Sequence, residues 1–339
     1  MSNLVRGAAL TNFSEVARKT GLDPYRLLAQ VGLPVNCLQE AELQLATEPV
    51  RKLLELAAQE SGVDNFGLLM AESRKLSNLG PFGLVLREEP TVRHALESVM
   101  RYRHLRNDAL LISLEDAGEL TIIHVELMMG QAAAIRQSLE LTQAVLFRLL
   151  RILLGPAWTP RSVCFMHAAP NDLKVHHRIF GHCVEFNQDF NGVVCSTHYL
   201  DAPIPSSDPV MARYAKQYLE TLHVKAHSSM AHEVRQLIFL LLPSGRCSID
   251  NTAQHLGVSR RTIHRRLAQD GESFSSILAA VRSELAARHL ESGTRPLSEI
   301  ADLLGFSELS AFSRWFHAKH GCSAQQWRAS HRTSSAPNA

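Results

Sequence analysis

Hydrogen-bond donors are concentrated near the C-terminus at residues 260–266, where four of the seven side chains are arginine and one is histidine. If this stretch is helical, a period of about 3.6 residues places Arg261, His264 and Arg265 on one face. A guanidinium group can donate two parallel hydrogen bonds to O6 and N7 of guanine in the major groove. The pattern therefore indicates recognition of nucleic acid.

The residues before this stretch predict the elements of a helix-turn-helix. Ile249, Ala253 and Leu256 fall on one face of a first short helix. Gly257 can adopt the left-handed conformation that ends a helix. Ser259 can then cap the next helix with its side-chain oxygen. That next helix would bury its apolar side and expose its donors, as a recognition helix requires.

The same pattern recurs further along the chain. A shift of 48 residues superimposes the first helix and its turn on a second set, and the recognition helix needs a shift of 49. The matching positions are Leu297, Ala301, Leu304, Gly305, Ser307, Phe312, Arg314 and Phe316. One copy would fit any helical hairpin with a glycine corner equally well. Two matched copies favour a tandem helix-turn-helix, with a connecting helix at about 274–291.

The charge distribution agrees with this placement. Residues 246–332 contain 12 Lys and Arg against 8 Asp and Glu, whereas the rest of the chain contains 23 against 25. A local positive excess suits contact with a polyphosphate. The excess is modest, so it supports the motif and would not identify a DNA-binding protein by itself.

Residues 248–328 resemble the DNA-binding domain of AraC-type transcriptional regulators. The resemblance lies in LGVSRRTIHRRL at 256–267, IA at 300–301, LGFS at 304–307, SAFSRWF at 310–316 and GCS at 321–323. The chain departs from the family at Ala324, where proline usually opens the last helix. Alanine at a first helical position should cost little, because proline there only presets the backbone.

In that family each helix-turn-helix enters one of two successive major grooves on one face of the DNA. The implied contacts are Arg260, Arg261, His264 and Arg265 on the first recognition helix, and Leu309, Ser310, Ser313 and Arg314 on the second. Leu309 could pack on a thymine methyl group. Arg260, like Arg266, suits a phosphate or is simply solvated surface. Arg314 could instead brace the fold, because aromatic residues crowd around it in the sequence.

The first two hundred residues change their apolar period repeatedly, which predicts a mixture of helices and strands. Helical periods occur at 12–31, 49–62, 65–74, 91–103, 132–154 and 171–180. Strands are expected at 109–114, 120–128, 162–167 and 192–198, the first two joined by a turn at 115–119. The expected fold class is an α+β N-terminal sensor domain followed by an all-α C-terminal domain of two helix-turn-helix units joined by a connecting helix.

Residues 20–208 resemble the ligand-binding domain that precedes the DNA-binding domain in one AraC subgroup, through LGPFG at 79–83, FGHCVEF at 180–186 and LDAPI at 200–204. This resemblance implies a small-molecule effector and pairing into a homodimer. The wider chain resembles regulators of ornithine use, which implies an amino-acid effector. Such an effector needs a carboxylate-binding arginine. Arg101, Arg103 and Arg106 are candidates, or they form a solvated helix face.

These observations predict four segments along the chain. They are an effector-binding and dimerisation domain at 1–207, a helical linker at 208–245, the tandem helix-turn-helix domain at 246–332 and a frayed tail at 333–339. The helix at 132–154 has apolar residues on more than one face. It is therefore either a buried core helix or a dimer surface.

Other functional classes lack their usual motifs. The chain has no G-x-S-x-G, H-E-x-x-H, Walker or Rossmann pattern, so we expect no enzyme. Its six cysteines have no C-x-x-C spacing and its 17 histidines form no ligand pattern, so we expect no metal, cofactor or disulfide frame. No apolar run has membrane-spanning length, and the first 18 residues lack a signal-peptide pattern, so a cytoplasmic location is expected.

The expected function is a ligand-responsive activator of catabolic genes. It would bind double-stranded operator DNA, take a small-molecule effector and contact RNA polymerase, with no membrane partner. Two alternatives remain open at this point. The chain could bind DNA without responding to any ligand, or its front domain could be an enzyme fused to a DNA reader.

Overall fold

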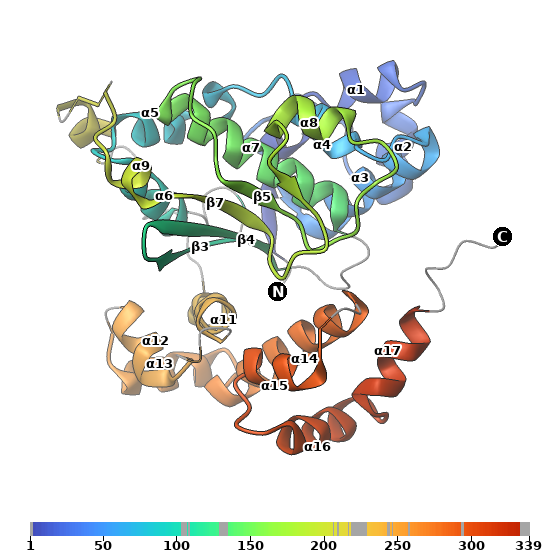
Figure 1. Ribbon diagram of the computed structural model, residues 1–339, viewed down its shortest axis with the longest axis vertical. Coiled ribbons are helices and arrows are strands. Elements are labelled where there is room, and N and C mark those ends of the chain that lie inside the picture. Colours follow the sequence, from blue (N-terminus) through green and yellow to red (C-terminus); the bar gives the residue numbers. More distant parts are fainter. Residues whose placement is uncertain are drawn as a thin grey trace. The chain divides into compact units, whose positions relative to one another are not determined.

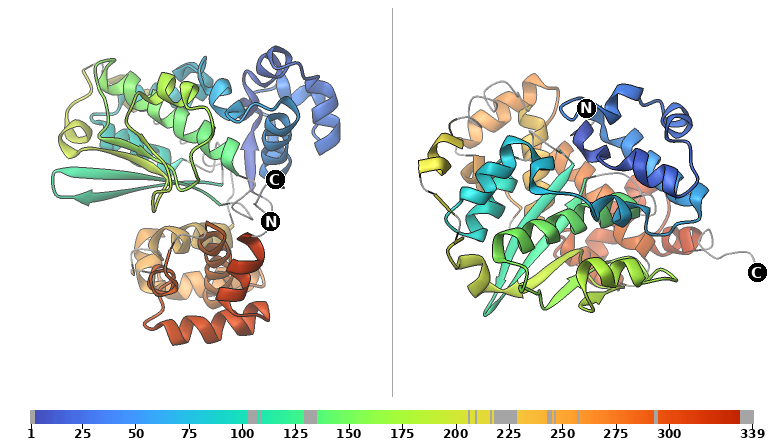
Figure 2. Two further views of the ribbon diagram at one scale, coloured as in Figure 1. Left: turned by 45° about the vertical axis from the view of Figure 1, so that its right-hand side comes forward. Right: turned by 90° about the horizontal axis from the view of Figure 1, so that it is seen from above.

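The computed structural model describes residues 3–102, 107, 109–128, 135–205, 207–208, 210–215, 217, 229–242, 245, 247–256, 258–292 and 295–332. Predictions for Gly257, Arg103, Arg106 and the tail at 333–339 therefore lie outside the described residues. The chain divides into two compact units, with the boundary between residues 227 and 228. Figures 1 and 2 show the elements of each unit.

The first unit is built around a five-stranded sheet with the order β3-β4-β7-β5-β6. The strands are β3 (Leu110–Ala117), β4 (Leu120–Leu127), β5 (Ser162–Cys164), β6 (Val184–Glu185) and β7 (Gly192–Ser196). Neighbouring strands are antiparallel except β5 and β6, which are parallel. Every second side chain of β4 is buried, because successive residues point to opposite faces. One face of the sheet therefore packs against the core.

The hairpin between β3 and β4 is tighter than the sequence predicts. Strand β3 continues to Ala117, and only Gly118 and Glu119 form the turn. Gly118 has a φ of +68°, which suits a two-residue hairpin turn and which glycine adopts without steric cost. The prediction of a turn at 115–119 was therefore wrong, and Asp116 is a strand residue that pairs with Arg93 at 3.1 Å.

Helices and two short strands complete the first unit. The helices are α1 (Phe13–Lys19), α2 (Pro24–Val31), α3 (Thr47–Ser61), α4 (Phe66–Ala71), α5 (Pro81–Glu88), α6 (Val92–Arg101), α7 (Arg136–Leu154), α8 (Lys174–Phe180) and α9 (Thr197–Asp201), with 3-10 helices η1 (Gly7–Leu10), η2 (Val35–Leu38) and η3 (Leu76–Leu79). Residues 210–215 are also helical. Strands β1 (Leu4–Arg6) and β2 (Gln44–Ala46) pair antiparallel. The predicted α+β class is confirmed, whereas α5, α9, β1, β2 and β6 were not predicted, and the last two residues of the strand predicted at 192–198 belong to α9.

Helix α7 is the central helix of this unit, on the same face of the sheet as α5 and α8 (Figure 1). Most of its side chains are buried, with Ile152 as an exposed exception. The amide of Gln143 donates to the carbonyls of Cys164 and Gly192 at 3.0 and 2.9 Å, which ties the helix to β5 and β7. Of the two alternatives for this segment, the buried core helix therefore agrees with the structure.

The second unit is entirely helical in its described part. Its helices are α11 (Met230–Leu241), α12 (Ile249–Leu256), α13 (Arg260–Gln269), α14 (Phe274–Ser292), α15 (Leu297–Leu303), α16 (Leu309–His320) and α17 (Ala324–Arg332). The starts of α12 and α15 lie 48 residues apart, and those of α13 and α16 lie 49 apart. The predicted repeat and its connecting helix, α14, are thus confirmed.

Helix α11 belongs to the packing of the second unit. It contacts α12, α13 and α14, and it buries Val234, Ile238 and Phe239. Within the described residues no helix is long and apolar enough to cross a membrane. All six cysteines are free thiols, and the described His, Cys, Asp and Glu side chains form no group of three suited to a metal ion.

Candidate DNA-binding site and ligand cavity

The first recognition helix, α13, is positioned by a cap and by two buried residues. The side-chain oxygen of Ser259 accepts a hydrogen bond from the N–H of Thr262 at 3.1 Å. This is the predicted cap, and it satisfies one donor of the first turn. Ile263 and Leu267 are fully buried, and α13 packs on α11 and α12. Burial of these two side chains turns the opposite face of the helix outward.

That outer face holds the predicted donors. Arg261, His264 and Arg265 are exposed, and within the described part of the chain none of them forms a hydrogen bond or ion pair. Arg260 is also exposed and lies 3.7 Å from Asp250 of α12. A solvated surface pair of this kind contributes little to stability. Three uncommitted donors on one helical face are suited to contact base edges or phosphates.

The second recognition helix, α16, starts one residue later in the repeat than α13 does. Its N-cap residue is Glu308, which lies 49 residues after Ser259, the N-cap residue of α13. Unlike Ser259, Glu308 does not cap its helix with a side-chain hydrogen bond. Leu309, Ser310 and Ser313 are exposed. The hydroxyl of Ser310 donates to the Glu308 carboxylate at 3.0 Å. The side chains on this face are therefore shorter and carry less charge than those on the outer face of α13.

The bracing alternative for Arg314 does not agree with its position, because its side chain is exposed. The brace is Arg282 of α14, which donates from Nε to the carbonyl of Leu304 at 2.8 Å and from Nη2 to that of Gly305 at 3.0 Å. Its guanidinium carbon also lies 4.5 Å from the ring centroid of Phe306. Sequence reasoning missed Arg282 because its partners are backbone carbonyls 22 and 23 residues away.

Helix α17 begins at Ala324, where the sequence departs from the AraC pattern. The hydroxyl of Ser323 accepts from the N–H of Gln326 at 3.2 Å, and the Gln326 side-chain oxygen accepts from the N–H of Ser323 at 2.9 Å. This reciprocal pair is a capping box, which satisfies two otherwise unpaired donors. The helix is therefore started by its cap, without the preset backbone of proline.

The first unit contains a cavity of about 150 Å³ between the sheet, α7 and the N-terminal segment. Its lining is mostly apolar and includes Phe82, Leu86, Leu110, Val125, Val145 and Leu149. Five polar residues also line it, namely Arg6, Arg74, Asn78, Asn107 and Thr142. An apolar pocket with a few polar anchors is typical of a small-molecule binding site.

Of the three arginines considered as candidates for binding an effector carboxylate, the one among the described residues lies away from the cavity. Arg101 is exposed at the end of α6 and is absent from the described lining of the cavity. This position agrees with the alternative of a solvated helix face. Arg6 and Arg74, which do line the cavity, were missed because each is a single arginine in an otherwise ordinary local pattern.

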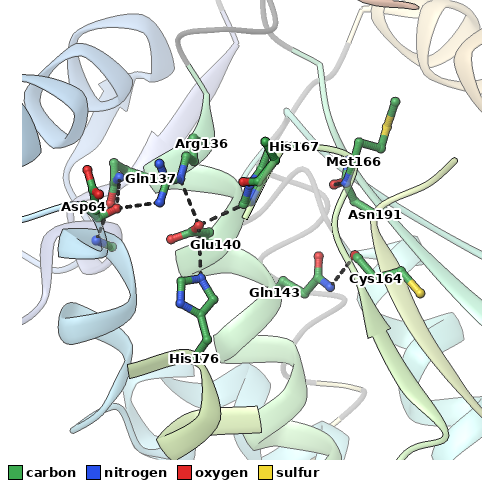
Figure 3. Close-up of polar contacts among 12 residues, drawn as sticks. Asp64, Arg136, Gln137, Glu140, Gln143, Cys164, Met166, His167, His176 and Asn191 are labelled. Atoms are coloured by element: carbon green, nitrogen blue, oxygen red, sulfur yellow. Dashed lines mark hydrogen bonds and ion pairs between the residues drawn. The ribbon is translucent and has the colours of Figure 1, made fainter. Parts of the chain in front are cut away.

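Polar side chains surround the buried Glu140 of α7, one of them buried and two half-buried (Figure 3). Glu140 Oε1 lies 3.3 Å from Nε2 of both His167 and His176, and 3.1 Å from Nε of Arg136. Burial alone would raise the pKa of Glu140, but the hydrogen bond from His176 and the nearby charges of His167 and Arg136 outweigh it, so the pKa is lowered. None of these four residues lines the cavity. We therefore interpret the group as a partly paired polar cluster of the core, in which Glu140 Oε2 and His176 Nδ1 have no hydrogen-bond partner in the described structure.

Two exposed recognition helices and a separate unit with an apolar cavity define a DNA-binding transcriptional regulator with a ligand-binding domain. The family model described as the arabinose-binding domain of AraC transcription regulator, N-terminal, matches residues 21–204. A model of a helix-turn-helix domain matches residues 252–330. The chain belongs to the AraC family of transcription regulators, as the sequence predicted.

Similar proteins, two of them matched along most of the chain and one over a shorter part, are regulators by name. The HTH-type transcriptional regulator VirS of Mycobacterium tuberculosis is 28% identical over 331 residues, which cover 97% of each chain. The ornithine utilization regulator of Pseudomonas aeruginosa is 26% identical over 75% of this chain and 76% of its own. The regulator VqsM of the same species is 35% identical, over 28% of this chain and 30% of its own.

Proposed function

We propose that this protein is a ligand-responsive activator of catabolic genes that binds operator DNA through α13 and α16. The observation that supports this most directly is the outer face of α13. Arg261, His264 and Arg265 are exposed there without protein partners among the described residues. A second helix-turn-helix repeats the arrangement, and α14 separates the two by a fixed helical length.

The two recognition helices would divide the work of recognition. On α13, the donors Arg261, His264 and Arg265 would contact bases, and Arg260 would contact a phosphate. On α16, Leu309 would pack on a thymine methyl group, with Ser310, Ser313 and Arg314 as polar contacts. The donors of α13 therefore supply most of the polar base contacts, whereas α16 contributes more to position and shape.

The proposed domain limits are 1–207 for effector binding and homodimer formation, 208–245 for the linker region and 246–332 for DNA binding. Because α11 packs on α12, α13 and α14, we extend the proposed DNA-binding domain of 246–332 back to residue 229, which shortens the proposed linker region to 208–228. Activation would involve RNA polymerase as a partner, and the protein would act in the cytoplasm, where bacterial operator DNA lies. The regulated genes would serve catabolism, and an amino acid such as ornithine is one candidate effector, after the name of a relative.

Two other functions have less support. A DNA-binding protein without a ligand would have no use for the apolar cavity of the first unit. An enzyme would need convergent titratable groups at a cleft. In the Glu140 group, Glu140 and His176 are buried and Arg136 and His167 are half-buried, and none of the four belongs to the described lining of the cavity.

Selection of operator sequences from a random duplex pool tests the assignment of α13. The Arg265→Ala variant should bind the selected duplex more weakly and lose preference at one base pair, at a cost of about 1–3 kcal/mol. Arg266→Ala is the matched control on the same helix. Fluorescence anisotropy should show at most a uniform weakening for this control. Parent-like affinity and preference in both Arg261→Ala and Arg265→Ala would refute the assignment.

A pair of C-terminal fragments tests the proposed limits of the DNA-binding domain. A fragment beginning at residue 229 should fold, stay monomeric and bind the selected duplex more weakly than the full chain. A fragment beginning at residue 246 loses the buried side chains Val234, Ile238 and Phe239, each of which contributes about 1.5–3 kcal/mol. It should melt at a lower temperature by circular dichroism. Equal melting temperatures would exclude α11 from the domain.

A further inference from the structure

The polar side chains around the cavity of the first unit offer mainly hydrogen-bond donors to its interior. Thr142 already donates its hydroxyl to a backbone carbonyl of its own helix at 2.7 Å. Asn78 and Asn107 each use the amide oxygen to accept a backbone N–H, at 2.6 and 3.0 Å. Among the described residues their amide NH₂ groups have no partner. Each of these asparagines can therefore still donate hydrogen bonds from its NH₂ group, whereas its amide oxygen already accepts one.

Two arginines of the lining add positive charge. Arg6 is only 6% exposed, and its Nη2 pairs with Glu42. Arg74 donates from its Nη atoms to the carbonyls of residues 8, 9 and 11. The Nε atoms of both arginines are buried and have no hydrogen-bond partner in the described structure. Each arginine therefore links its own segment to a distant one, and each still has one hydrogen-bond donor, Nε, without a partner.

The positive charge of Arg74 has no acidic partner among the described residues, and that of Arg6 is paired with a single carboxylate. The partners of Arg74 are neutral carbonyls, and the Glu42 side chain is 74% exposed. Burial lowers the pKa of both arginines, that of Arg74 to about 10, which reflects the cost of burying their charge. The described lining of the cavity includes no Asp or Glu. An unpaired buried donor costs free energy, and a bound carboxylate would remove that cost at both arginines.

The size and walls of the cavity limit the rest of the ligand. An apolar protein cavity of about 150 Å³ can hold a benzene ring, and this cavity has about the same volume. The side chains of Phe82, Leu110 and Val145 form part of its apolar lining. The cavity therefore has room for a ring or a chain of roughly six carbons.

We propose that the effector is a small, mostly apolar carboxylate whose anionic group binds between Arg6 and Arg74 and whose ring or short chain fills this cavity. The proposal rests on the function proposed above, because it names the ligand class of that sensor domain. The proposed site argues against ornithine, because its two ammonium groups would lie near two guanidinium groups in a cavity whose described lining includes no Asp or Glu. Aromatic and short aliphatic carboxylates share the required chemistry.

Thermal unfolding and titration calorimetry of the full-length chain test the ligand class. The probes are benzoate, phenylacetate, hexanoate and octanoate, each compared with the neutral alcohol of the same carbon skeleton, and with ornithine. A ligand that binds only the folded state raises the melting temperature with concentration. At least one carboxylate should do so and bind at least tenfold more tightly than its alcohol. A rise with ornithine or the alcohols alone would overturn the proposal.

Three variants locate the binding site. Arg74→Met should weaken binding of the carboxylate at least tenfold and leave that of the alcohol nearly unchanged. Val145→Phe keeps both arginines but fills the cavity, so it should weaken both ligands. Arg101→Met removes an exposed arginine of the same unit and should change neither. If Arg74→Met does not fold, Arg6→Gln replaces it. Parent-like affinity in the cavity variants, or equal losses for acid and alcohol in the arginine variants, would overturn the proposal.

Binding to the selected DNA duplex, measured separately, distinguishes this proposal from the proposed function. If the full chain binds the duplex but no carboxylate raises its melting temperature, the ligand class is wrong and the DNA-binding function stands. If a carboxylate binds as expected but no duplex is selected, the cavity assignment stands and the DNA-binding assignment fails.

Discussion

Arg282 joins the connecting helix to the turn of the second helix-turn-helix through a single side chain. It donates to the carbonyls of Leu304 and Gly305, which end α15, and its flat guanidinium lies on Phe306. Carbonyls at a helix C-terminus have no partner within the helix. Arginine is suited to satisfy two of them at once because its donors are held in a planar fork.

Replacing Arg282 should therefore destabilise the second unit. Arg282→Met keeps most of the apolar length of the side chain but removes both hydrogen bonds, so we expect a loss of about 1–3 kcal/mol in the free energy of unfolding. Urea titration of the full chain or of a C-terminal fragment measures it. Arg314→Met is the control, since an exposed residue should change stability by at most about 0.5 kcal/mol. A larger loss of stability in Arg314→Met than in Arg282→Met would contradict the role assigned to Arg282.

A site residue can be predicted from the sequence when its partners lie on the same helix or strand, and not when they come from distant segments of the chain. Arg261, His264 and Arg265 lie on one helix face, and their spacing alone predicts this shared surface. Arg6 and Arg74 come from distant segments and meet only at the cavity. No local period connects two such residues, so the pocket could not be predicted from the sequence.

At the scale of elements, length decided what the sequence could predict. The 19-residue helices α7 and α14 repeat their apolar pattern over several turns, and both were predicted within a few residues at each end. Strands β1, β2 and β6 have only two or three residues, which is too short for an alternating pattern. Strand β5 is equally short, but it begins the longer segment 162–167 that the sequence predicted as a strand. Helix α5 has eight residues with adjacent apolar side chains at 84–86, a run that does not define a single helix face.

Helix α14 also contains a buried histidine that should make the second unit sensitive to acid. Burial, with the neighbouring charges of Arg295 and Arg288, lowers the pKa of His289 to about 3. Its pKa in the unfolded chain is about 6.5. Since the folded value is the lower one, the unfolded state binds more protons below pH 6.5, and stability is lost as the pH falls from there toward 3.

His289→Gln should remove this contribution, because glutamine does not titrate. Between pH 6.5 and 4 the parent should lose up to about 1.4 kcal/mol per pH unit more than the variant does. Denaturant unfolding of the C-terminal fragment at several pH values measures both slopes. His264→Gln, a change at an exposed histidine of the same unit, is the control. Parallel pH profiles for parent and His289→Gln would disprove the assignment.

At the scale of the whole molecule, the question is how an occupied cavity could alter DNA binding. Helix α5 lines the cavity through Phe82 and Leu86. At its C-terminal end, the Glu88 carboxylate accepts from the N–H of Asp208 at 2.8 Å, and the Glu88 carbonyl accepts from the hydroxyl of Ser207 at 2.9 Å. These residues begin the segment that leads along the chain to the second unit. One helix therefore contacts both the ligand site and the start of the connection.

We expect Glu88→Ala to separate ligand binding from its effect on DNA. Coupling between two sites typically changes affinity by about 5–150-fold, and such coupling requires an element whose state both sites influence. If α5 is that element, the effector should still raise the melting temperature of the variant. Its effect on affinity for the selected duplex should shrink toward none. Glu97→Ala, at an exposed position of α6, should keep the full effect. An unchanged coupling factor in Glu88→Ala would mean that the signal leaves the sensor domain by another route.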